Sequence, residues 1–345
     1  MIAMPGFVET HWHLWNTACR ALIQADHPEY GYFPVTVRLG AEQVEIEGSS
    51  QAVELSARLF DFGVLSLRAT LGLETPRPWA EWTSSAAQVT AGDWNPHFRQ
   101  WKDRLISRLA AAIVKPEDSG VTEDYTVFQV HRLLDPEGRP FPLEWLTDDL
   151  VAGLLFGEGR PLSGSARREL LSQRYSYFED DLTILTWNAA LVVEPVVEDT
   201  DVPYILEFAN AQLVELRYYD TVLDRELPRL HGDIAAARRG FHFIGRKYGR
   251  LLAALQSRVT DTTDVVEHVE NSLKVTEDVY LARIYAAALE IFRGPTWRRG
   301  IDRKVAIVRE AYSMLNDESE GRRAEVLELT IILLIALEIV VALRR

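Results

Sequence analysis

Two histidines near the start of the chain are the first residues whose type and spacing could do chemistry. His11 and His13 lie one residue apart in the stretch "MPGFVETHWHLWNT", residues 4–17. Because alternate residues of a strand point to the same face, two imidazoles at this spacing could bind one metal ion. A zinc site needs a third or fourth ligand, and three of the six other histidines fall on predicted helices. We therefore expect neither a metal nor another cofactor.

Polar residues at helical spacing form a second candidate cluster in the C-terminal part of the chain. Asn210 and Asp220 fall on or beside an apolar seam whose residues recur at steps of four and three, as in helices that pack against a partner helix. Buried polar residues at such a seam commonly set its register at some cost in stability. The pattern predicts a polar network between long helices, and a solvated helix face is the alternative. The network residues are Glu207, Asn210, Arg217, Asp220, Glu270, Asn271, Lys274 and Asp278.

A basic patch stands out because the chain has a net charge of −14. That charge argues against DNA as a partner of the whole chain, but a local patch could still contact anionic lipid headgroups or ribosomal RNA. Solvent exposure without any partner is the third interpretation. The patch consists of Arg238, Arg239, Arg246, Lys247 and Arg250.

The C-terminus is strongly apolar. Residues 329–343 read "LTIILLIALEIVVAL", and counting from Val326 the stretch approaches the length of about 17 residues that a membrane-spanning helix needs. A helix that is apolar all round lies either in lipid or inside an assembly, and a carboxylate at mid-bilayer costs roughly 2.5–3.5 kcal/mol. We expect an anchor in the cytoplasmic membrane with the bulk of the chain in the cytoplasm, or else a helix buried in an oligomer. The residues that define this segment are Leu329, Ile332, Leu333, Glu338 and Val341.

The elements that must position these residues change in character along the chain. Up to about residue 200, strands and helices alternate, and from Tyr204 onward long helices follow. The fold class expected is therefore α+β, with an N-terminal mixed sheet-and-helix domain, a long-helix bundle and a C-terminal apolar helix. The expected domains are 1–40, 41–200, 201–325 and 326–345. Individual strands are predicted at 59–71, 124–134 and 182–195, and helices at 97–114 and 143–157.

The first part of the chain resembles a known enzyme superfamily. Residues 5–13, "PGFVETHWH", are similar to the first metal-binding strand of the amidohydrolases. That resemblance implies a barrel with further histidine ligands and a catalytic aspartate from later strands, and no repeating strand-and-helix unit follows here. Residues 1–40 are therefore predicted to be a fragment without function, either fused to another protein or produced by a misplaced translation start.

Residues 57–345 resemble a family of unknown function that includes the mitochondrial "required for meiotic nuclear division" proteins and their bacterial relatives. The resemblance implies an α+β portion, a helical portion and a C-terminal membrane anchor. In eukaryotes it implies a link to the mitochondrial inner membrane and to mitochondrial translation, with no enzymatic reaction. The strings that carry it are "RLFDFGVLSLR" (58–68), "YSYFEDDLTILTWNAALVVEP" (175–195), "ILEFANAQLVELRYYDTVLDREL" (205–227), "ENSLKVTEDVYLARIY" (270–285), "WRRGIDRKVAIV" (297–308) and "LELTIILLIALEIV" (327–340).

The chain shows no motif that would make it an enzyme. No nucleophile stands beside a base, and the loop "GEGRPLSG" at 157–164 lacks the Lys-Ser/Thr ending of a phosphate-binding loop. We expect a non-enzymatic, membrane-anchored scaffold that forms homo-oligomers through coiled-coil contacts. One alternative is an ion channel, because the layout resembles that of CorA-type magnesium channels. A metal-dependent amidohydrolase is the other alternative.

Overall fold

A computed structural model describes most of the chain. The described residues are 7–23, 35–46, 49–60, 62–72, 77–110, 113–135, 137–140, 142–157, 162–196, 201–239, 278–310, 313, 328, 330–332 and 334–335. The chain divides into two compact units, which are considered separately. Unit 1 comprises residues 1–218 and 272–295, and unit 2 comprises residues 219–271 and 296–345.

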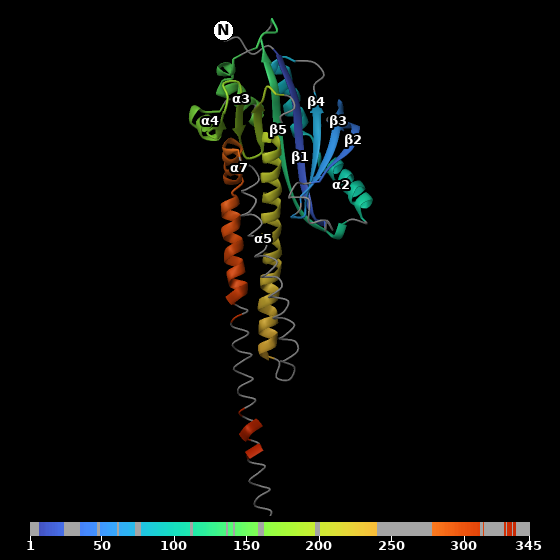
Figure 1. The fold of residues 1–345 in the computed structure, drawn as a ribbon, viewed down its shortest axis with the longest axis vertical. Coiled ribbons are helices and arrows are strands. Elements are labelled where there is room, and N and C mark those ends of the chain that lie inside the picture. Colours follow the sequence, from blue (N-terminus) through green and yellow to red (C-terminus); the bar gives the residue numbers. More distant parts are fainter. Residues whose placement is uncertain are drawn as a thin grey trace, which may run out of the picture. The chain divides into compact units, whose positions relative to one another are not determined.

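Unit 1 is built on one eight-stranded sheet with the strand order β2-β3-β4-β1-β5-β8-β7-β6 (Figure 1). Neighbouring strands are antiparallel except for β5 and β8, which run parallel. Mixed strands and helices confirm the α+β fold class. The strands are β1 (Phe7–Ile23), β2 (Val35–Ile46), β3 (Ser49–Leu59), β4 (Val64–Gly72), β5 (Ile113–Leu134), β6 (Arg174–Tyr175), β7 (Leu182–Leu185) and β8 (Ala189–Val193).

The helices begin at positions that suit helix N-termini. The Ser163 side chain accepts a hydrogen bond from the Ala166 backbone N–H, and Asp278 accepts hydrogen bonds from Tyr280 and Leu281. Such side-chain caps satisfy backbone donors that the first helical turn leaves open. Residues 294–310 are also helical. The named helices are α1 (Trp79–Ala91), α2 (Asn95–Leu109), η1 (Leu143–Trp145), α3 (Asp148–Phe156), α4 (Gly164–Leu170), α5 (Asp201–Arg239) and α7 (Val279–Ile291).

Two predicted strands are confirmed only in part, because each contains a turn. The segment 59–71 is divided by a turn in which Gly63 has a φ of 86°, and the Gly63 N–H donates to the Phe60 carbonyl. A glycine adopts this left-handed conformation without steric cost, so the chain reverses there and β4 pairs with β3. The segment 182–195 forms a hairpin instead of one long strand. The Thr186 hydroxyl donates to the Ala189 carbonyl at 2.6 Å and stabilises its turn.

One face of the sheet carries the main hydrophobic core, together with helices α1, α2 and α3. Trp82 of α1 is fully buried, and its ring lies 5.1 Å from that of Trp79 and 6.0 Å from that of Phe128 on β5. Apolar residues at every second position of the strands produce this face, because side chains at alternate positions point to the same side. The predicted helices at 97–114 and 143–157 correspond to α2 and to η1 with α3, except that α2 ends at Leu109 and residues 113 and 114 already belong to β5.

The opposite face of the sheet is covered in part by α7 and by the first part of α5. Tyr125 has the opposite parity to Phe128 on β5, and its ring lies 5.3 Å from that of Phe292, just after α7. The Phe208 ring on α5 lies 5.7 Å from that of Phe60. Because odd and even positions of a strand point to opposite sides, these helices lie across the sheet from α1. Within unit 1 the sheet is thus a central layer.

A carboxylate on β2 links the sheet to α2 and makes stability depend on pH. Glu42 accepts a hydrogen bond from Trp101 Nε1 at 3.0 Å and pairs with Arg104 at 2.7 Å. Partial burial would raise the pKa of Glu42, but the hydrogen bonds from Trp101 and Arg104 outweigh it, so this pKa is lowered. A carboxyl group with a lowered pKa in the folded state stabilises the fold at higher pH. That contribution is lost as the pH falls through the folded-state pKa.

We therefore expect Glu42→Gln to flatten the acid limb of the stability profile. Between about pH 5 and about pH 3 the native protein should lose more free energy of unfolding than the variant, since only the native protein takes up this proton on unfolding. Urea denaturation at several pH values measures the difference. Glu45→Gln, at an exposed position of the same strand, is the matched control. Parallel profiles for the native protein and Glu42→Gln would show that Glu42 contributes nothing.

Candidate functional site

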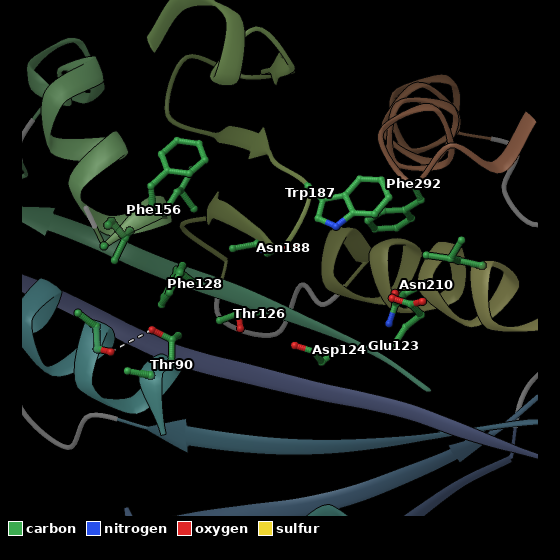
Figure 2. Close-up of a pocket in the computed structure, with 17 residues that line it drawn as sticks. Thr90, Glu123, Asp124, Thr126, Phe128, Phe156, Trp187, Asn188, Asn210 and Phe292 are labelled. Atoms are coloured by element: carbon green, nitrogen blue, oxygen red, sulfur yellow. Dashed lines mark hydrogen bonds between the residues drawn. The ribbon is translucent and has the colours of Figure 1, made fainter. Parts of the chain in front are cut away.

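A cavity of about 570 Å³ lies in unit 1 between α1 and α3 on one side and α5 and α7 on the other (Figure 2). Strand β5 and the turn between β7 and β8 complete its walls. A volume of several hundred cubic ångströms is typical of sites for small molecules. The cavity is therefore a candidate binding site within the described part of unit 1.

Strand pairing positions one wall of the cavity. Thr126 on β5 pairs with Ala189 on β8, and the Thr126 N–H donates to the Asn188 carbonyl at 3.1 Å. The β7–β8 turn that precedes Ala189 thereby brings Trp187 beside Phe292, with ring centroids 6.4 Å apart (Figure 2). The Trp187 ring also contacts the Arg293 guanidinium at 5.6 Å, a cation–π distance. Two segments about a hundred residues apart in the sequence thus form one aromatic wall.

The polar groups of this cavity are carboxylates, carboxamides and hydroxyls. Glu123 and Asp124 supply carboxylates, and Asn188 and Asn210 supply carboxamides. Thr90 and Thr126 add hydroxyls, and the described lining residues include neither a basic side chain nor a cysteine. Glu123 is also ion-paired with Arg217 of α5. The lining suits a ligand that donates hydrogen bonds or carries positive charge.

A buried ion pair joins α5, one of the helices that line the cavity, to strand β3 of the sheet. Glu207 has a side chain that is 2% exposed, and it pairs with Arg58 on β3. The Arg58 guanidinium also lies 4.8 Å from the centre of the Tyr204 ring. Burial lowers the pKa of the neighbouring Arg68, the nearby Glu207 carboxylate opposes that shift, and the positive charge of Arg58 adds to it. These charges form a compact group on the face of the sheet opposite α1.

The predicted network residues on α5 have partners on strands as well as on helices. Glu207 and Arg217 pair with Arg58 and Glu123, which lie on β3 and β5, and Asn210 lines the cavity. The sequence prediction placed these contacts between long helices. Sequence reasoning missed the strand residues, because an isolated arginine or glutamate in an alternating strand does not reveal its partner. The one available signal was that β3 has polar residues at alternate positions, and Arg58 is one of them.

A helix-to-helix hydrogen bond does occur within unit 1, between residues that the sequence reasoning did not select. The Tyr285 hydroxyl on α7 donates to Gln212 Oε1 on α5, and both residues are buried. Burial raises the pKa of Tyr285 above its ordinary value, although the hydrogen bond to Gln212 acts in the opposite direction. The tyrosine therefore stays neutral and links the two helices.

In unit 2 the predicted network residue Asp220 contacts a second helical segment. Lys304, within the helical residues 294–310, lies 2.6 Å from Asp220 and 2.6 Å from Asp224. Partial burial would lower the pKa of Lys304, but the hydrogen bonds to both carboxylates outweigh it, so this pKa is raised. Lys304 is a further residue that the sequence reasoning did not select.

Several predicted site residues lie outside the described residues. They are Glu270, Asn271 and Lys274 of the network, Arg246, Lys247 and Arg250 of the basic patch, and Leu329, Leu333, Glu338 and Val341 of the apolar tail.

The remaining predicted residues have described positions. Asp278 caps α7, the backbones of Arg238 and Arg239 end α5, and Ile332 is helical and exposed. No helix of the described residues is long and apolar enough to cross a membrane.

The His-x-His segment lies on a strand, as expected from its spacing. His11 and His13 on β1 occupy the register positions opposite Gly72 and Thr70 of β4. Among the described residues, no cluster of three or more histidine, cysteine, aspartate or glutamate side chains could hold a metal ion.

Comparison with known proteins identifies the family. No solved structure matches the chain. A relative from Methanocaldococcus jannaschii, named uncharacterized protein MJ0711, is 23% identical over 245 residues, which is 71% of this chain and 73% of the relative. The comparisons do not show the resemblances to amidohydrolases or to the meiotic-division proteins.

The match to a family model also bears on the first strand. The model describes the N-terminal domain of uncharacterized protein MJ0711 and matches residues 8–200, a span that contains nearly all of β1. The segment that resembles an amidohydrolase fragment thus lies within the matched domain. Since the match covers more than half of the sequence, the chain belongs to the family of the MJ0711 N-terminal domain, a family of uncharacterized proteins.

Proposed function

We propose that the protein is a non-enzymatic, self-associating scaffold held at a membrane by its apolar C-terminal segment. One observation carries the proposal: four large aliphatic side chains of the described tail are more than half exposed to solvent. Burying such a side chain is worth about 1.5–3 kcal/mol, so a run of them in water is strongly unfavourable. The residues are Ile331 (51%), Ile332 (56%), Leu334 (58%) and Ile335 (52%).

The sequence around these residues supports a lipid environment for them. The apolar run continues to Leu343, which makes it long enough to reach across most of a bilayer. The resemblance of residues 57–345 to the meiotic-division proteins also implies an anchor at this end of the chain. Glu338 supports self-association, because a carboxylate within lipid is least unfavourable where it faces another helix.

Membrane extraction of matched chains tests the anchor. The full chain and a chain that ends at Glu325 are expressed, and their membranes are washed with alkaline carbonate. We expect the full chain to stay in the pellet and the shortened chain to be soluble, because only the full chain has an apolar segment to bury. Equal thermal unfolding of the shortened chain would show that its folded part is intact.

Two further measurements complete the test. The double substitution Ile331→Lys and Ile335→Lys should release the full chain from the pellet, whereas the matched change Ala306→Lys, at an exposed position outside the tail, should not. Light scattering in mild detergent should report an oligomer. A native chain that carbonate releases would contradict the anchor, and a monomer in detergent would contradict the scaffold.

A further inference from the structure

Strands β2, β3 and β4 carry a polar surface on the face of the sheet opposite α1 and α2. Arg38 on β2 lies directly opposite Ser56 on β3, and Ser56 lies opposite Arg68 on β4. Directly opposed residues share a face, so these three side chains form one row across the sheet. In the adjacent rows, Thr36 lies opposite Arg58 and Glu54 lies opposite Thr70.

This polar surface is hollowed. A cavity of about 550 Å³ lies over the three strands. A bulge at Gly40, which has a φ of 99°, shifts the register of the edge strand β2 beside it. Glycine adopts this conformation without strain, and bulges commonly redirect the side chains around them. The polar residues lining the hollow are Thr36, Arg38, Glu54, Ser56, Arg68 and Thr70.

The two arginines of the hollow differ from Arg58 in their partners. Arg58 is ion-paired with the buried Glu207, so its charge is compensated within the fold. Arg68 Nε donates to the Ser56 hydroxyl at 3.1 Å, which orients the guanidinium, and its two terminal nitrogens carry further N–H donors. Arg38 is exposed at the edge strand. Among the described lining residues Glu54 is the one carboxylate, so with Arg38 and Arg68 the described lining carries net positive charge in a chain whose net charge is −14.

We propose that this hollow binds a small, soluble phosphate-bearing molecule, with Arg38 and Arg68 on the phosphate oxygens. A guanidinium matches the geometry of a phosphate and bonds to it through two parallel N–H groups. The hydroxyls of Thr36 and Ser56 supply further donors around the same volume. The hollow is large enough for a ligand of mononucleotide size. The charge of this lining is opposite to that of the acidic cavity beside Glu123, so the two cavities suit different ligands.

Strand β1 extends the same rows toward the centre of the sheet. Trp15 occupies the register position opposite Arg68, and His13 occupies the position opposite Thr70. The His-x-His segment therefore lies on the strand next to the hollow, although the proposal depends only on the residues of β2, β3 and β4.

Titration calorimetry of the full chain tests the proposal. The probes are inorganic pyrophosphate and adenosine monophosphate, each at two salt concentrations. We expect saturable binding of at least one probe, at one site per chain, with an affinity that falls as salt rises. Arg68→Met should weaken binding about tenfold to a hundredfold, because it removes charge-assisted hydrogen bonds to the ligand. Arg38→Met, at an exposed edge position, should weaken it in the same direction without disturbing the fold.

The matched control is Arg99→Met, which removes the same charge from an exposed position on α2. It should leave the affinity for both probes unchanged. The proposal is overturned if neither probe binds saturably, or if Arg99→Met weakens binding as much as Arg38→Met.

A separate experiment uses phosphatidylglycerol vesicles with the chain ending at Glu325. Vesicle binding that Arg38→Met abolishes, without binding of either soluble probe, would assign the hollow to lipid headgroups and would also overturn the proposal.

Discussion

Arg58→Ala is expected to lower the free energy of unfolding by about 3–5 kcal/mol, since it leaves a buried carboxylate without its counter-charge. Glu207 is almost fully buried on α5, and it forms an ion pair with Arg58 on β3. Removing one member of a buried pair leaves the full desolvation penalty of the other. The Arg58 contact with the Tyr204 ring is lost at the same time. Chemical denaturation followed by far-ultraviolet circular dichroism measures the effect.

Two comparisons isolate the burial of this pair. Arg139→Ala breaks an exposed pair with Asp135 and should leave the free energy of unfolding almost unchanged. The double substitution Arg58→Met with Glu207→Leu should recover much of the stability that Arg58→Ala loses, because neither charge of the pair is then left buried without the other. If Arg58→Ala were as mild as Arg139→Ala, Glu207 would have to be solvated or paired elsewhere, and the docking of α5 on β3 would be wrong.

Trp82→Ala should be comparably destabilising, at about 3–5 kcal/mol, through the loss of core packing. Trp82 is fully buried where α1 packs on the sheet, and its ring contacts those of Trp79 and Phe128. Truncation removes the transfer free energy of the indole and leaves a cavity that the surrounding helix and strand cannot fill completely. Thermal and urea denaturation of the variant give the change directly.

Trp145→Ala is the control for the tryptophan substitution, because the Trp145 side chain in the short helix η1 is 44% exposed. It should lower stability much less than Trp82→Ala. A substitution Trp82→Phe keeps most of the apolar volume, so its effect should lie between the two. Equal losses for Trp82→Ala and Trp145→Ala would contradict the position of α1 in the core.

The pattern of residue types predicted the local elements well where the pattern is strong. The segment 124–134, which is followed by the turn residues 135–138, was predicted as the strand that proves to be the second half of β5, and helical spacing indicated α2. The α+β class followed from the same patterns. These properties depend on neighbours a few residues apart, so the local sequence contains the information needed to infer them.

Turns were harder to recognise than strands. The segments 59–71 and 182–195 each read as one continuous strand, because their apolar residues run on through the reversal. Gly63 and Thr186 decide those reversals, the first by its left-handed backbone and the second by its hydroxyl. Long-range pairing of the resulting short strands then stabilises the turns, and such pairing has no local signature.

Charges and polar residues could be recognised from the sequence, but their partners could not. Glu207 stood out as a polar residue at helical spacing, yet its partner Arg58 lies 149 positions earlier, on a strand. The positive hollow exists only because the register of β2, β3 and β4 places Arg38, Ser56 and Arg68 in one row. A sequence specifies which groups are present and with what periodicity. Which of them meet is decided by strand register and helix docking, since these bring together residues far apart along the chain.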